Sequence, residues 1–117
     1  MPVPLYQAKA EFFRMLGHPV RIRVLELLQD GPKAVRELLT EIDTEPSSLS
    51  QQLAVLRRSG IVLSEREGGT VVYQLAGGDV AELMAAARRI LTEMLSDRNA
   101  LLAELRGEAA TASGRPR

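Results

Sequence analysis

The sequence of 117 residues contains no cysteine and no tryptophan, and it has a single histidine. Without cysteine the chain can form no disulfide, no thiolate metal site and no thiol redox switch. Aromatic residues make up only 3% of a chain that is 45% hydrophobic, so leucine, valine and alanine must build its core. This composition favours a mostly helical protein with a single domain.

An excess of charge of either sign is also lacking, because fifteen basic residues balance fifteen acidic ones. Non-specific binding to nucleic acid depends on basic side chains that neutralise phosphates. The balanced net charge is therefore mild evidence against non-specific nucleic-acid binding. No apolar run reaches the length of a membrane span, and the first residues lack the regions of a signal peptide. We therefore expect a cytoplasmic protein without a membrane partner.

Apolar residues recur at helical spacing along most of the chain. The spacing predicts helices over residues 5–16, about 19–29, about 34–42, 46–59 and about 80–106. His18 stands before Pro19 at a helix start, where capping or packing is a far commoner role for histidine than metal binding. On the second helix, Arg21 is expected to face outward.

The third and fourth predicted helices are joined by a short turn, which is typical of a helix-turn-helix motif. Thr44 or Glu45 is expected to cap the fourth helix, with Pro46 in its first turn. Gly60 is expected to end it in the left-handed conformation.

Two β-rich runs, residues 61–67 and 70–75, follow this motif and are joined by Gly68-Gly69, which predicts a hairpin. A hairpin directly after a helix-turn-helix is a wing. The predicted fold is therefore mainly α with a small β-hairpin (α+β), a winged helix-turn-helix. We expect it to occupy residues 1–106, and the composition of residues 107–117 predicts a disordered tail.

Residues 47–60 are the most informative stretch, because their apolar and polar positions separate onto two helix faces. Leu49, Leu53 and Leu56 fall in one narrow stripe. The other face carries small polar residues, which are mediocre helix surface but good partners for base edges and phosphates. It predicts DNA contacts by Ser47, Ser48, Ser50, Gln51, Gln52, Arg57 and Arg58.

Within this set, Gln51 points directly away from the apolar stripe and is the best candidate for reading a base, ideally adenine. Gln52 lies nearer the stripe and is a weaker candidate, for a backbone contact. Arg66, Thr70 and Lys33 are further candidates for phosphate contacts.

Each of these interpretations has an alternative. The polar face can be solvated helix surface, and Arg57 and Arg58 can complement the negative end of the helix dipole. Arg66 can form a salt bridge with Glu65 or Glu67 on the wing. The balanced net charge also keeps open a winged-helix module that binds another protein. An enzyme is not expected, because no nucleophile–base pair and no glycine-rich phosphate loop is present.

The last predicted helix is about 40 Å long, more than a small winged core can cover. Its surplus apolar stripe predicts a homodimer in which a second copy of the chain covers the last helix. The expected interface residues are Leu5, Tyr6, Phe12, Phe13, Leu83, Ala87, Ile90, Leu91, Met94, Leu101 and Leu102. The three aromatic residues among them could instead line an effector pocket.

In three segments, residues 13–28, 48–62 and 67–75, the chain resembles the ArsR/SmtB family of bacterial winged-helix repressors. The resemblance implies a homodimer built from the terminal helices. It also implies operator binding through the fourth helix and the wing, which usually represses transcription. We therefore expect a repressor that binds double-stranded DNA at a palindromic operator.

The chain departs from the metal-sensing members of that family. They carry a Cys-x-Cys pair on the third helix, whereas here Glu37 follows Ala34, Val35 and Arg36. The last helix has carboxylates but no histidine to complete the family's other metal site. We therefore expect no transition metal and no cofactor, and any effector remains to be identified.

Overall fold

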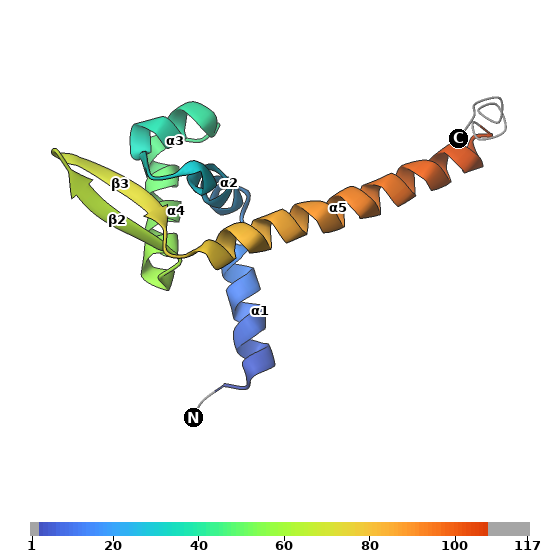
Figure 1. The fold of residues 1–117 in the computed structure, drawn as a ribbon, viewed down its shortest axis with the longest axis horizontal. Coiled ribbons are helices and arrows are strands. Elements are labelled where there is room, and N and C mark those ends of the chain that lie inside the picture. Colours follow the sequence, from blue (N-terminus) through green and yellow to red (C-terminus); the bar gives the residue numbers. More distant parts are fainter. Residues whose placement is uncertain (1–2, 108–117) are drawn as a thin grey trace. The chain divides into compact units, whose positions relative to one another are not determined.

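The computed structural model of the protein describes residues 3–107 (Figure 1). The chain divides into two compact units, residues 1–82 and 83–117, and the boundary lies within the last helix. The first unit contains the helix-turn-helix and the sheet, and the second contains most of the last helix. Of the predicted tail, residues 108–117 lie outside the described residues.

The first unit begins with two helices and a short 3-10 turn. Helix α1 spans Leu5–Leu16, α2 spans Pro19–Leu27, and the 3-10 helix η1 follows at Leu28–Asp30. The Nδ1 atom of His18 accepts a hydrogen bond from the Val20 backbone N–H at 3.1 Å. The predicted capping role of the only histidine is thus confirmed.

Strand β1 and helix α3 stand where the sequence predicts a single helix over residues 34–42. Strand β1 is Lys33–Ala34 and α3 is Val35–Glu41. Lys33 and Ala34 are extended because they pair with another strand, and a two-residue strand is too short to show a periodicity. The Ala34 N–H then donates to Glu37 Oε1 at 2.7 Å, which satisfies one of the free amides at the start of α3.

Helix α4 spans Pro46–Ser59 and completes the helix-turn-helix. Its N-cap is Glu45, one of the two residues that the sequence predicts at this position, but the Glu45 side chain forms no capping hydrogen bond. Pro46 reduces the need for one, because proline has no N–H to satisfy in the first turn. Gly60 ends the helix with φ 85° and ψ 1°, which confirms the predicted left-handed residue.

Strands β2 (Val62–Glu67) and β3 (Thr70–Leu75) form the predicted hairpin, which lies beside α4 (Figure 1). Gly68 and Gly69 have φ of 56° and 85°, as a tight hairpin turn requires at its two central residues. The sheet has three antiparallel strands in the order β1-β3-β2. The hairpin is therefore extended by one short strand that the sequence does not predict.

Aliphatic side chains from the helices and from strands β1 and β2 of the first unit form its core, with α4 packed against α2 and β2. The largest fully buried side chains are Val24, Leu25, Leu38, Leu49, Leu53, Leu56 and Val62. Arg21 is half-buried rather than exposed, so its expected outward orientation is wrong. Its burial is tolerated because the guanidinium donates two hydrogen bonds.

Helix α5 spans Gly78–Leu105 and is the longest element of the chain. Beyond Ala87, all but one of its residues are exposed, including a series of large apolar side chains. None of the helices within residues 3–107 combines the length and the hydropathy of a membrane-spanning segment.

Candidate nucleic-acid interface

Helix α4 separates its residues onto a buried and an exposed face, as the sequence predicts. Leu49, Leu53 and Leu56 are at most 1% exposed and hold the helix against the core. Ser47, Ser50 and Gln51 are exposed. The first two turns therefore present short polar side chains that no other part of the first unit covers.

The two glutamines of α4 have different surroundings. Gln51 is exposed, whereas Gln52 is half-buried and its Oε1 accepts a hydrogen bond from Arg21 Nε at 2.7 Å. Ser48 is also half-buried, on the flank of the exposed face. Gln51 is thus the glutamine whose amide is directed to solvent and able to pair with a base edge.

Arg57 and Arg58 lie in the last turn of α4 and both are exposed. Their guanidinium groups stand near the negative end of the helix dipole, which stabilises the helix. Exposure leaves the same groups able to contact phosphates, so the dipole and phosphate roles are compatible.

On the wing, Arg66 and Thr70 flank the glycine turn. Arg66 is exposed and its Nη1 lies 3.4 Å from the Gly69 carbonyl oxygen. Within residues 3–107 no ion pair joins Arg66 to Glu65 or Glu67, so the alternative of a wing salt bridge is not realised. Arg66 and the half-buried Thr70 thus lie at the end of the hairpin, as a phosphate-contacting wing tip requires.

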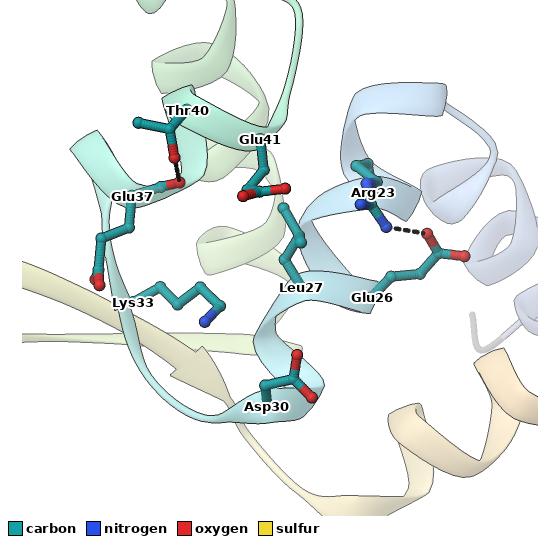
Figure 2. Close-up of a pocket in the computed structure, with 8 residues that line it drawn as sticks. All are labelled: Arg23, Glu26, Leu27, Asp30, Lys33, Glu37, Thr40 and Glu41. Carbon is teal, nitrogen blue, oxygen red and sulfur yellow. Dashed lines mark hydrogen bonds and ion pairs between the residues drawn. The ribbon is translucent and has the colours of Figure 1, made fainter.

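Lys33 lies apart from the other candidates. Its side chain extends into a pocket with Asp30, Glu37 and Glu41 on its border (Figure 2). The pocket is lined from α2, η1, β1 and α3, and neither α4 nor the wing contributes a residue. Carboxylates around an ammonium group compete with phosphate for it, so Lys33 is the least favourable of the predicted contacts.

The same pocket contains an ion pair between Arg23 Nη1 and Glu26 Oε1, at 3.1 Å (Figure 2). Both side chains are more than 40% exposed, so the pair contributes little to stability. Among residues 3–107, no three His, Asp or Glu side chains are grouped so as to hold a metal ion.

The candidate dimer residues are largely exposed in both units. On α1, Leu5, Tyr6 and Phe13 are between 56% and 77% exposed, and Phe12 packs edge-on against Phe13 with ring centroids 5.5 Å apart. On α5, Leu83 and Ala87 are half-buried. The other α5 candidates are exposed, namely Ile90, Leu91, Met94, Leu101 and Leu102.

Comparison with known proteins identifies the family. The family model described as "Bacterial regulatory protein, arsR family" matches residues 18–64, from the cap of α2 into β2. An uncharacterized HTH-type transcriptional regulator of Mycobacterium tuberculosis, Rv0081, is 53% identical over 110 residues, covering 92% of this chain and 96% of that protein.

The chain belongs to the arsR family of bacterial regulatory proteins. It is a winged helix-turn-helix transcriptional regulator, as the resemblance in the sequence implies. The relatives are named as regulators and repressors, which gives no support to the protein-interaction alternative.

Solved structures agree with this fold. The crystal structure of M. tuberculosis Rv0081 has a TM-score of 0.76 and 52% identity, covering 83% of this chain and 98% of that one. The homodimeric winged helix-turn-helix DNA-binding domain Mb0332 of Mycobacterium bovis has a TM-score of 0.70 and 31% identity. The match covers 80% of this chain and 86% of that one. The transcriptional repressor BigR of Xylella fastidiosa has a TM-score of 0.68 and 36% identity. The match covers 73% of this chain and 87% of that one.

Proposed function

We propose that this arsR-family regulator is a homodimeric repressor that binds a palindromic DNA operator. The observation that carries the proposal is the exposed polar face of α4, from Ser47 to Gln51, held outward by fully buried leucines on its other side. A helix presented in this way can enter a major groove, where each base pair has a distinct pattern of donors and acceptors. Gln51 reads a base, and Arg57, Arg58 and the wing residues Arg66 and Thr70 contact phosphates.

The second part of the proposal is the dimer. The exposed apolar side chains of α1 and α5 are too numerous for a monomer to leave in water without aggregation. A second copy of the chain covers them, and the solved winged helix-turn-helix domain Mb0332 of M. bovis, which supports this part of the proposal, is described as homodimeric. Two recognition helices related by a twofold axis fit two half-sites of a palindrome. The protein then acts by binding alone, without catalysis, in the cytoplasm where bacterial DNA is found.

The test is operator binding by the parent and three variants, after footprinting on genomic DNA has located the operator. Gln51→Ala removes a base contact, so we expect operator affinity to fall about fivefold or more while affinity for unrelated duplex is unchanged. Arg58→Ala removes a phosphate contact, so it weakens binding to all sequences and lowers the salt slope by about one.

Thr40→Ala is the matched control, because Thr40 is exposed on α3 and its hydroxyl bonds only the Glu37 carbonyl of the same helix. This variant should bind like the parent, and fluorescence anisotropy at several salt concentrations measures all four proteins. Parent-like binding by both Gln51→Ala and Arg58→Ala would contradict the assignment of α4 as the DNA-contacting helix.

A further inference from the structure

One half-buried guanidinium connects α4 to the first helix of the chain. Arg21, in the first turn of α2, donates from Nε to Gln52 Oε1 at 2.7 Å and from Nη1 to the Met15 carbonyl oxygen at 2.6 Å. Gln52 belongs to α4 and Met15 to the last turn of α1. Three helices of the first unit therefore meet at a single side chain.

The chemistry of each contact explains why arginine is suited to this position. The Met15 carbonyl is one of the last four of α1, which have no partner within the helix. A cation there also complements the negative end of the α1 dipole. The planar guanidinium presents its nitrogens at a fixed spacing, so it can reach both acceptors at once. A lysine ammonium is a single point and cannot occupy both donor positions.

The contact with Gln52 constrains how α4 is rotated about its own axis. Gln52 lies between the exposed Gln51 and the buried Leu53, about 100° from each along the helix. If the Gln52 side chain is held from the α2 side, the neighbouring Gln51 is directed outward at a defined angle. A base contact is sensitive to this angle, because a bidentate hydrogen bond requires two aligned atom pairs.

We propose that Arg21 is a positioning residue for DNA recognition, and that Gln52 is its anchor on α4 rather than a base-reading residue. Arg21 sets the angle at which α4 presents Gln51 and ties it to the end of α1, the helix assigned to the dimer. This inference depends on the proposed function, since it assigns a role in operator discrimination.

The test uses the full-length protein and the variants Arg21→Lys, Gln52→Met and their combination. Arg21→Lys keeps the positive charge, and Gln52→Met keeps the side-chain length, so both should fold. We expect each to lower operator affinity about tenfold, which corresponds to ~1.4 kcal/mol, and to leave affinity for unrelated duplex within twofold. The double variant should lose no more than either single variant, because both remove the same bond.

Gln51→Ala is the comparison variant. Because Arg21 acts by positioning Gln51, Arg21→Lys should cost much less operator affinity in the Gln51→Ala background than in the parent, and fully additive losses would overturn the inference. Additive losses for Arg21→Lys and Gln52→Met would overturn the inference, because each side chain would then contact DNA independently. Equal losses of affinity for operator and for unrelated DNA, together with a lowered Tm of the variants, would also overturn the inference. Such a result would show that Arg21 and Gln52 have a structural role alone.

A measurement without DNA separates this inference from the proposed function. In the NMR spectrum of the parent, the Arg21 Nε–H signal should exchange slowly with water, and in Gln52→Met it should be lost to exchange. A rapidly exchanging signal in the parent would overturn the bond itself. Absence of any sequence-specific DNA binding by the parent would instead overturn the proposed function, whatever the NMR signal shows.

Discussion

At the scale of single residues, position in the fold decides between roles that the side chains alone leave open. The imidazole of His18 can bind metal or cap a helix, and its Nδ1 accepts the Val20 N–H. Gln51 and Gln52 are chemically identical neighbours, yet one is exposed and the other is held by Arg21. The partner within hydrogen-bond distance, rather than the residue type, therefore assigns the role.

The His18 cap gives a stability prediction. His18→Ala leaves the Val20 N–H without its side-chain partner, so we expect the free energy of unfolding to fall by about 0.5 to 2 kcal/mol. His18→Asn supplies another side-chain acceptor at the same position and should recover most of that loss. Urea unfolding followed by circular dichroism measures both. Equal destabilisation by the two substitutions would show that ring packing, rather than the hydrogen bond, is the contribution of His18.

At the scale of elements, backbone pairing and chain reversals determine where the functional surfaces lie. The turn at Gly68-Gly69 keeps β2 and β3 in register from Val62↔Leu75 to Glu67↔Thr70. That register places Arg66 and Thr70 at the end of the hairpin. The short strand β1 pairs with β3 through Lys33↔Tyr73 and Ala34↔Val72, which joins the start of the helix-turn-helix to the wing.

The wing turn can be tested through its backbone conformation. Gly69 has φ 85°, a region that costs a residue with a Cβ about 1 to 2 kcal/mol, so Gly69→Ala should destabilise the hairpin. Gly68→Asn is the matched control, because asparagine is favoured at the first central position of such turns. We expect amide exchange of β2 and β3 to accelerate in Gly69→Ala and to stay near the parent's in Gly68→Asn. Unchanged exchange in both would mean that the turn does not limit hairpin stability.

At the scale of the whole molecule, the main feature is the set of apolar residues in the two units that a single chain leaves exposed to water. Leu91, Met94 and Leu95 of α5 are each more than 50% exposed, and Leu5 of α1 is 70% exposed. Transfer of this surface out of water is favourable by about 25 cal/mol per Å², so a partner surface of the same kind stabilises the chain. The proposed dimer follows from this need.

The dimer can be tested by adding charge to that surface. The double substitution Leu91→Glu and Met94→Glu puts two carboxylates among apolar contacts, so we expect a monomer by analytical ultracentrifugation and loss of operator binding. The first unit should keep its circular dichroism signature of folded helices. Ser96→Glu is the control for an added carboxylate, because Ser96 is exposed on a different side of α5. A dimeric double variant would contradict the assignment of α5 to the interface.

Much of the fold could be predicted because its signals are local. The leucine stripe of α4, the glycine after it and the glycine pair of the wing each determine structure within a few residues. Strand β1 could not be predicted, since Lys33 and Ala34 are extended only because β3 lies beside them. Likewise, Arg21 resembles a surface arginine until Gln52, 31 residues away, supplies its acceptor.

The sequence alone thus determined the order of the α-helices and the hairpin, the winged helix-turn-helix class and the polar face of α4. These properties follow from periodicity and turn chemistry, which act between neighbours in the chain. Only the tertiary structure decided that Arg21 joins three helices, that Gln52 is held by Arg21, and that Lys33 lies among carboxylates. Each depends on groups brought together by folding, and hydrogen bonds and charges act over distances in space rather than along the sequence.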